Sequence, residues 1–201
     1  MTSIKHRGGH GKSLRAPEPV LGISRSRARA YTPKLKSVRS FVALGANLPS
    51  RAGSPAETLR AALVELSRAG VAIKRVSKLY SSPAWPDPTD PSFVNAVAEA
   101  QTNLSPIQLL ELLHATETAF GRTRSKRNAP RTLDLDIIDF DSRVERGPPR
   151  LPHPRLSSRA FVLVPLQDIA PEWIHPASGE SVAALIAALP ARDRDSVTEL
   201  R

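Results

Sequence analysis

The chain has 201 residues, of which 40% are hydrophobic, and this length and composition suit one globular domain with a hydrophobic core. It contains no cysteine, which excludes disulfides and thiolate zinc sites and is typical of proteins from a reducing cytoplasm. No apolar run approaches the roughly 20 residues of a membrane-spanning helix, so we expect no membrane partner.

The net charge of +10 lies mostly near the N terminus. Residues 1–40 hold ten Lys or Arg and one acid, whereas residues 41–201 hold nineteen and eighteen. Residues 1–38 contain too few large apolar side chains to offset the entropy of folding, so we expect a disordered basic extension. Such a leader also suits a transit peptide or a nucleic-acid tail, but we favour a variable extension. Residues 39–201 are then the folded domain, and we expect no specific nucleic-acid partner because its charge is close to neutral.

Strands and helices are expected to alternate along this domain. Apolar or alternating runs predict strands at residues 41–45, 71–80, 93–102 and 133–140. The pairs Ser54-Pro55 and Ser105-Pro106 are helix-start signals, and Gly70 and Gly121 are the expected stops. The second helix is expected to bury Ile107, Leu109, Leu110 and Leu113.

A proline-rich loop and two further helices complete the predicted order. Residues 82–91 hold four prolines, which predict a stiff loop without regular structure. Helices are expected at residues 157–169, with a kink at Pro165, and at residues 181–189. The β-α-β-β-α-β order predicts an α+β fold, a ferredoxin-like βαββαβ sandwich with additional C-terminal helices.

Two carboxylates on the last predicted strand are the first sign of chemistry. Asp134 and Asp136 are two residues apart, so they share one face of the strand while the flanking Leu133, Leu135 and Ile137 face the core. Like charges repel, and a bound divalent cation is the usual reason for them to coexist. Hard oxygen ligands favour Mg²⁺, and two such ions could bridge a polyphosphate.

Basic residues just before this strand supply the opposite charge. They are Arg122, Arg124, Lys126, Arg127 and Arg131. Guanidinium groups bind phosphate oxygens through paired hydrogen bonds. Either feature alone is more often a solvated charge run, but the combination favours phosphate chemistry with a Mg-nucleotide and leaves the acceptor substrate open.

Separate motifs run in a fixed order from about Phe41 to Pro176. They are Ala43–Leu48, Tyr80 with Ser82-Pro83, Phe93–Ala96, Glu117 with Gly121-Arg122, Ala129–Ile137, Leu151–Pro154 and Arg159–Leu166. In this order and spacing they resemble the 6-hydroxymethyl-7,8-dihydropterin pyrophosphokinase family. The resemblance implies a ferredoxin-like, monomeric, cytoplasmic enzyme of folate biosynthesis. Such an enzyme transfers the pyrophosphoryl group of ATP to 6-hydroxymethyl-7,8-dihydropterin and releases AMP.

The resemblance also implies roles for individual residues. Asp134 and Asp136 match the ligands of two Mg²⁺ ions bound with ATP, and Arg122 and Arg131 match catalytic arginines that contact the triphosphate. The other ATP-binding positions are Glu117, Arg124, Arg127, His153 and Arg159. The pterin-binding positions are Ser82, Pro83, Trp85, Phe93, Asn95 and Phe161, with the two phenylalanine rings expected on opposite faces of the pterin.

Two other functions stay open on the sequence. A ferredoxin-like sheet can bind RNA through paired aromatics within a basic face, but the near-neutral domain and its acidic strand argue against this. The second is a different Mg-dependent nucleotidyl or phosphoryl transferase, and only the pterin-pocket residues distinguish the expected pyrophosphokinase from it. Without the family pattern, Phe93 and Phe161 would be interpreted as core aromatics and His153 as a loop histidine.

Overall fold

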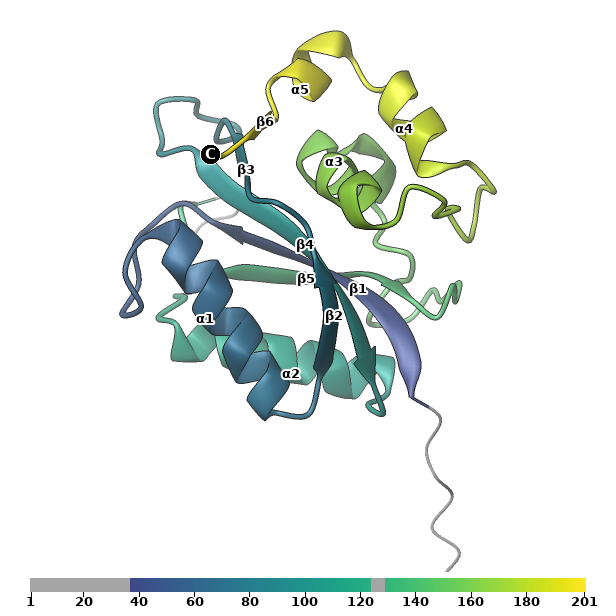
Figure 1. The fold of residues 1–201 in the computed structure, drawn as a ribbon, viewed down its shortest axis with the longest axis horizontal. Helices are drawn as coiled ribbons and strands as arrows, with labels where there is room; N and C mark the ends of the chain where they lie inside the picture. Colours follow the sequence, from purple (N-terminus) through teal and green to yellow (C-terminus); the bar gives the residue numbers. More distant parts are fainter. Residues whose placement is uncertain (1–36, 124–128) are drawn as a thin grey trace, which may run out of the picture. The chain divides into compact units, whose positions relative to one another are not determined.

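A six-stranded antiparallel sheet organises residues 37–123 and 129–201, the part of the chain that the computed structural model describes (Figure 1). The strands are β1 (Val38–Ala46), β2 (Ala72–Val76), β3 (Tyr80–Ser82), β4 (Phe93–Thr102), β5 (Asp134–Phe140) and β6 (Thr198–Glu199). Their spatial order is β5-β1-β4-β3-β6, and β2 also pairs with β4. The two long strands β1 and β4 therefore form the centre of the sheet.

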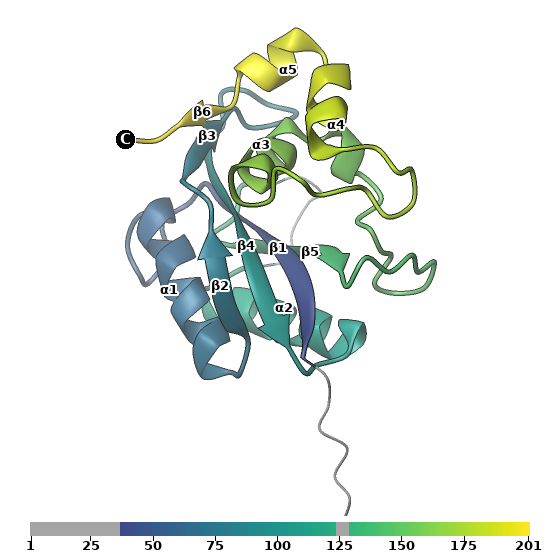
Figure 2. The same ribbon diagram turned by 45° about the vertical axis from the view of Figure 1, so that its right-hand side comes forward.

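Helices cover both faces of this sheet, which makes the fold a mixed α+β fold (Figures 1 and 2). On one face lie α1 (Pro55–Arg68) and α2 (Pro106–Ala119), and on the other lie α3 (Ala160–Ile169) and α4 (Val182–Ala188). The short helices are η1 (Leu156–Ser158) before α3 and α5 (Ala191–Asp195) after α4. Within the described ranges, none of the helices has the length and apolar character that crossing a membrane requires.

Alternation along the central strands feeds two hydrophobic cores. Leu44 of β1 and Leu135 of β5 pack with Leu109 of α2 in the core under α1 and α2. Val97 of β4 packs with Leu163 of α3 in the core on the opposite face. Successive side chains of a strand point to opposite faces, so one strand serves both cores.

The two long helices begin where the Ser-Pro pairs predict. The Ser54 hydroxyl accepts a hydrogen bond from the Glu57 N–H, and the Glu57 carboxylate accepts one from the Ser54 N–H. Ser105 and Gln108 make the same reciprocal pair at the start of α2. Each cap satisfies N–H groups that the first helical turn leaves unpaired, and is worth about 1 kcal/mol.

The structure corrects several predicted elements. The first strand begins at Val38, and the segment predicted as one strand at residues 71–80 forms two, β2 and β3. Between them the Ser77 hydroxyl accepts the hydrogen bond of the Val97 N–H, so a side chain replaces the backbone in the ladder. Ile107, expected in the core, is 43% exposed. The helix α5 and the strand β6 were not predicted, and β3 extends to Ser82, so the proline-rich loop begins one residue later than the predicted range 82–91.

Candidate active site

A cavity of about 910 Å³ opens beside one end of the central strands. Its walls come from β1, β3, β4, β5, the start of α3 and the C-terminal segment. Twelve of the predicted site residues line it: Ser82, Pro83, Trp85, Phe93, Asn95, Arg122, Arg131, Asp134, Asp136, His153, Arg159 and Phe161. Arg124 and Arg127 lie outside the described residues, and Glu117 is not among the lining residues.

The two carboxylates of β5 lie on the cavity side of the strand, as the spacing predicts. The neighbouring Leu135 is only 1% exposed and belongs to the core, whereas the side chains of Asp134 and Asp136 are 28% and 37% exposed. Antiparallel pairing with β1 fixes this orientation, with Gly45 opposite Asp134 and Ala43 opposite Asp136. Both carboxylates are therefore available to a ligand in the cavity.

Arginines from three segments balance these carboxylates. Asp134 pairs with Arg122 through Oδ1 at 2.5 Å and with Arg131 through Oδ2 at 2.9 Å. Asp136 Oδ2 lies 3.2 Å from Arg159 Nη1 and 3.8 Å from His153 Nε2. The prediction that the carboxylate pair needs a metal ion to balance its charge is therefore incomplete, because the protein supplies its own cations.

Glu117 lies behind this centre and not on the cavity wall. It is 3% exposed, its Oε1 accepts a hydrogen bond from the Leu135 N–H at 2.7 Å, and the same oxygen contacts Arg122 Nη1. Burial raises the pKa of Glu117 to about 7, against the opposing effects of the Leu135 hydrogen bond and the Arg122 charge. In this position Glu117 contacts both Arg122 and the backbone of β5.

The cationic groups of the site respond differently to burial. Burial alone would lower the pKa of Arg122, but the carboxylates of Asp134 and Glu117 outweigh it and raise that pKa above its ordinary value. Burial lowers the pKa of His153, and the nearby Asp136 only partly opposes this. Around neutral pH the site therefore holds arginine charges together with a largely neutral histidine.

A polar pocket occupies another part of the cavity. The amide of Asn95 is buried, and its Nδ2 donates to the Ser82 hydroxyl at 2.9 Å. Gly45 pairs with Asn95 on one side and with Asp134 on the other. A Cβ at this glycine would stand 3.4 Å from Asn95 Oδ1 and 3.9 Å from Asp134 Cβ. Because glycine has no side chain, the cavity surface between the polar pocket and the carboxylates is unobstructed at Gly45.

Aromatic rings form the remaining surface of this pocket. Phe161 is 36% exposed and Trp85 is 71% exposed, so neither ring serves the core. Guanidinium groups stack near two of the rings, with Arg131 5.8 Å from the Phe93 centroid and Arg159 5.6 Å from the Phe161 centroid. Flat rings facing a cavity suit a flat heterocyclic ligand.

Sequence reasoning missed a structural link between two walls of the cavity. Asn47 follows β1 and is 4% exposed; its Oδ1 accepts from the Arg131 N–H at 2.7 Å, and its Nδ2 donates to the Pro91 carbonyl at 3.0 Å. The N–H groups of Asn47 and Leu48 both donate to the Arg131 carbonyl. One buried amide thus holds the end of the proline-rich loop and the arginine that faces Asp134.

Several lining residues that follow the acidic strand were not predicted from the sequence. Arg155 and Ser158 line the cavity beside His153, and the C-terminal segment adds four more residues. Those four are Arg192, Asp193, Ser196 and Val197. No local pattern in the sequence marks them, because their place on the cavity depends on how the C-terminal helices pack.

The donor set can be tested against a divalent cation. Asp134 and Asp136 offer hard carboxylate oxygens on one strand face, which is the ligand type that Mg²⁺ prefers. Across the described ranges, no group of three or more His, Cys, Asp or Glu side chains is arranged to hold a metal by itself. The residues fit Mg²⁺ bound through one or two carboxylates, with further ligands from substrate phosphates and water.

Comparison with known proteins gives the family of this chain. The model of the 7,8-dihydro-6-hydroxymethylpterin-pyrophosphokinase (HPPK) family matches residues 41–171. A 2-amino-4-hydroxy-6-hydroxymethyldihydropteridine pyrophosphokinase from Synechocystis is 41% identical over 149 residues, 73% of this chain and 74% of that protein. Its namesake from Pseudomonas aeruginosa is 42% identical over 154 residues, 76% of this chain and 92% of that protein.

Solved structures agree on the fold. The Plasmodium falciparum HPPK-DHPS wild type superimposes with a TM-score of 0.57 at 14% identity, over 77% of this chain and 41% of that one. A double mutant of the same protein, with pterin and p-hydroxybenzoate, gives a TM-score of 0.62 over 84% of this chain and 48% of the other. The chain thus spans less than half of these solved chains. With the family model and both bacterial relatives in agreement, the chain belongs to the hydroxymethyldihydropterin pyrophosphokinase family, a kinase of folate biosynthesis.

Proposed function

We propose that the cavity binds ATP and 6-hydroxymethyl-7,8-dihydropterin side by side and that the β,γ-pyrophosphoryl group passes from one to the other. One observation carries the proposal: Gly45 joins an aromatic and amide pocket to a centre of carboxylates and arginines on one continuous floor. The first part suits a flat heterocycle with polar edges, and the second suits a metal-bound polyphosphate.

The pterin is proposed to lie between Phe93 and Phe161. The Asn95 amide offers a donor and an acceptor to the pterin edge, and its hydrogen bond to Ser82 fixes its orientation. Pro83 and Trp85 would close the outer side of the pocket. A buried amide needs hydrogen-bond partners, and a pterin edge supplies them.

The triphosphate is proposed to lie over β5. Arg122 and Arg131 face Asp134, and Arg159 faces Asp136 beside His153, so guanidinium groups lie next to both carboxylates. Guanidinium groups bind phosphate oxygens bidentately. We propose Glu117 as the positioning residue of Arg122 within the nucleotide site, while Arg124 and Arg127 keep the nucleotide-binding roles expected from the family.

Asp134 and Asp136 are the proposed ligands of Mg²⁺. Two ions bound there with ATP would neutralise phosphate charge and polarise the phosphorus that is attacked. The arginines paired with these carboxylates hold them in position on the cavity side of β5.

The reaction proposed for this geometry is an in-line displacement. The hydroxymethyl oxygen of the pterin bonds to the β-phosphorus, and the bond from that phosphorus to the oxygen bridging the α- and β-phosphates breaks. AMP leaves with the bridging oxygen, and the hydroxyl proton is lost to solvent. Arg122 and Arg131 stabilise the charge on the moving group, an effect worth roughly 10²–10³ in rate for one well-placed donor. A loose transition state needs little early deprotonation of the hydroxyl.

The proposal extends to the fold type, the oligomeric state and the cellular compartment. The antiparallel order β5-β1-β4-β2, with α1 and α2 on one face, supports the ferredoxin-like βαββαβ sandwich. We also propose that the enzyme acts as a monomer, as the resemblance to the family implies. We also propose the cytoplasm as its compartment, where ATP is available.

Product analysis tests the proposed function. Purified protein is incubated with Mg-ATP and 6-hydroxymethyl-7,8-dihydropterin, and nucleotide products are separated by chromatography. The proposal requires AMP and pterin diphosphate in equal amounts. Formation of ADP would instead indicate a different phosphoryl transferase, and nucleotide turnover that ignores the pterin would reject the acceptor.

A further inference from the structure

The C-terminal segment, residues 191–201, forms a wall of the cavity that the family match does not reach. Arg192, Asp193, Ser196 and Val197 line the cavity, whereas the family model matches only residues 41–171. The segment consists of α5, the connecting Ser196 and Val197, β6 and the last two residues. Figures 1 and 2 show both elements beside β3 and α3, on the side of the sheet where the proline-rich loop begins.

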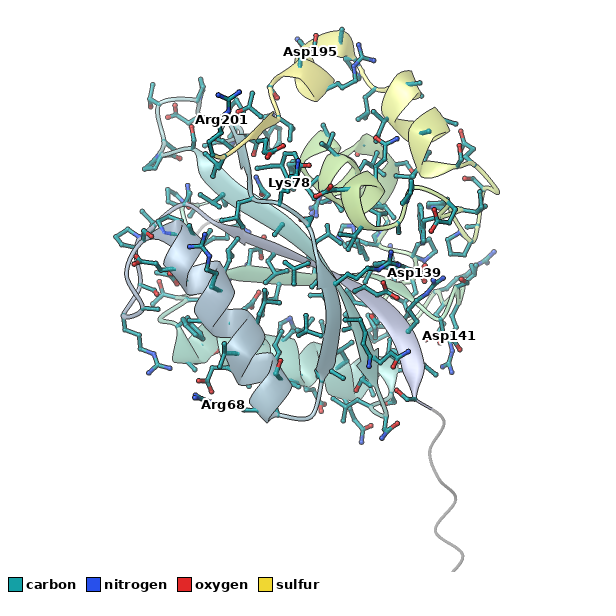
Figure 3. The ribbon with its side chains drawn as sticks, in the orientation of Figure 1. Arg68, Lys78, Asp139, Asp141, Asp195 and Arg201 are labelled. Atoms are coloured by element: carbon teal, nitrogen blue, oxygen red, sulfur yellow. The ribbon has the colours of Figure 1, made fainter. Side chains whose placement is uncertain are left out.

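The segment is attached to the strand that carries Ser82. In the β3–β6 pair, Tyr80 lies opposite Glu199 and Ser81 opposite Thr198. The Leu200 N–H donates to the Leu79 carbonyl at 2.8 Å, and Lys78 Nζ pairs with Glu199 Oε2 at 2.8 Å. Both contacts are made by residues directly before β3. In Figure 3, Lys78 lies beside α3 and Arg201 lies at the end of β6.

The strand that is held in this way is too short to be stable by itself. β3 has three residues, and its other partner is β4, with Tyr80 opposite Asn95 and Ser82 opposite Phe93. Without β6, β3 would be a short edge strand with one row of unpaired backbone groups. The hydrogen bond from Asn95 Nδ2 to the Ser82 hydroxyl depends on the position of β3.

We infer that residues 191–201 are a positioning element of the pterin site: β6 holds β3, and through it Ser82, in register with Asn95, while Ser196 forms part of the pocket wall. The inference rests on the pterin site proposed above. It predicts that changes in this segment weaken pterin binding and spare ATP binding, because the carboxylate and arginine centre is built from β5, the basic loop and the start of α3.

The backbone link is tested with two substitutions at one position. Leu200→Pro removes the N–H that donates to Leu79, whereas Leu200→Ala removes the side chain and keeps that N–H. Dissociation constants for a non-hydrolysable ATP analogue and for the pterin are measured by calorimetry, beside a thermal melt. We expect Leu200→Pro to weaken pterin binding about five-fold relative to Leu200→Ala, the ratio for one net hydrogen bond. ATP-analogue binding should stay within about two-fold.

The pocket wall is tested at a second position, which also serves if Leu200→Pro does not fold. Ser196→Leu adds bulk to the wall, and Ser196→Ala removes the same hydroxyl, with its hydrogen bond to the Asp193 carbonyl, without adding bulk. Asp195→Leu places the same side chain on the adjacent exposed position of α5, which Figure 3 shows on the outer side. Only Ser196→Leu should weaken pterin binding, by about five-fold or more.

Two outcomes would overturn the inference, and a third concerns the function. Equal losses for the pterin and the ATP analogue, in step with a lower melting temperature, would show that the segment only stabilises the fold. Unchanged pterin binding in both Leu200→Pro and Ser196→Leu would remove the segment from the site. If the unmodified chain fails to bind the pterin at all, the proposed acceptor is wrong, which is a separate result.

Discussion

Asp134 and Asp136 share a strand face but differ in what surrounds them. Asp134 accepts from Arg122 and Arg131, which come from opposite ends of the basic loop, and so ties that loop to β5. Asp136 faces Arg159 at the start of α3 and is more exposed, with 37% of its side chain accessible against 28% for Asp134. Removal of Asp136 should therefore disturb the fold less and isolate its role as a ligand.

We predict that Asp136→Asn lowers turnover by about 10²–10³-fold, the usual loss when one electrostatic contact to the reacting group is removed. The melting temperature should change little, because the pair with Arg159 is partly exposed and such pairs contribute at most about 1 kcal/mol. An AMP-release assay and a thermal melt measure both quantities. Asp141→Asn, an exposed carboxylate away from the cavity (Figure 3), is the control. Near-normal turnover of Asp136→Asn at limiting Mg²⁺ would reject the metal assignment.

Glu117 predicts a pH dependence of stability. Burial raises its pKa from 4.5 to about 7, so the folded state holds a proton that the unfolded state has lost over this pH range. The stabilising contribution is complete below pH 4.5 and is lost as the pH rises to about 7. Compared with Glu117→Gln, which does not titrate, the wild type should lose up to about 3 kcal/mol of unfolding free energy across this window. Denaturant unfolding of both proteins from pH 4.5 to 8 measures it, and a constant difference would show that Arg122 keeps Glu117 charged throughout.

Phe161 distinguishes a pterin-stacking ring from a structural one. A ring stacked on a heterocycle contributes roughly 1–3 kcal/mol, so Phe161→Ala should weaken pterin binding about ten-fold and ATP binding much less. Phe93→Tyr keeps the ring face and should be tolerated. Because Phe161 is 36% exposed, its loss should not cost the roughly 3–5 kcal/mol of a buried aromatic. Calorimetric titration with each ligand and a denaturation curve distinguish the two roles. Equal losses of affinity for both ligands, together with a large drop in stability, would show that Phe161 has a structural role.

At the scale of elements, the site is assembled where strands end. β1 ends at Ala46, and Asn47 directly after it holds Arg131 and Pro91 in place. β4 begins at Phe93, immediately after the proline-rich loop, and β5 begins at Asp134. The sheet itself thus carries cavity-lining groups such as Asp134 and Asn95, and the adjoining loops add others such as Arg131.

The link through Asn47 should matter for both substrates. We predict that Asn47→Ala lowers stability by about 1–3 kcal/mol, because it leaves the Arg131 N–H and the Pro91 carbonyl without their partner. It should also raise the KM of ATP and of the pterin together. Asn47→Asp keeps the acceptor for Arg131 and loses the donor to Pro91, so its defect should be larger for the pterin. Steady-state kinetics with each substrate varied in turn test this, and a stability loss with unchanged KM values would make Asn47 purely structural.

At the scale of the whole molecule, the charge of the chain and the charge of its site are separate matters. Residues 1–36 hold nine Lys or Arg and one acid, and they lie outside the described residues. The arginines of the cavity come from residues 122, 131, 155, 159 and 192. The net charge of +10 is therefore no guide to the cationic site.

Deletion of residues 1–36 tests this separation. The deletion stops before β1 begins at Val38, so the sheet is kept whole. We predict unchanged AMP release and earlier elution from a phosphate-bearing cation exchanger, because eight net positive charges are removed. A large loss of turnover in the shortened chain would show that the extension takes part in the site.

Features whose cause lies within a few residues could be predicted from the amino-acid sequence. The capping boxes at Ser54 and Ser105 each act over three residues, so both helix starts were predictable. The alternation Leu133 to Ile137 placed Asp134 and Asp136 on one face, and the family motifs identified twelve residues that line one cavity. Short-range chemistry and motif order were enough for these.

Features that depend on partners far apart in the chain could not be predicted without the folded structure. Glu117 lies behind Arg122 because α2 packs under β5, and whether Ile107 joins the core depends on how α2 packs, which leaves its side chain exposed. β3 and β6 pair across contacts such as Lys78 to Glu199, which are 121 residues apart. Two- and three-residue strands carry too little local preference to be recognised alone, since their stability comes from the neighbour they pair with.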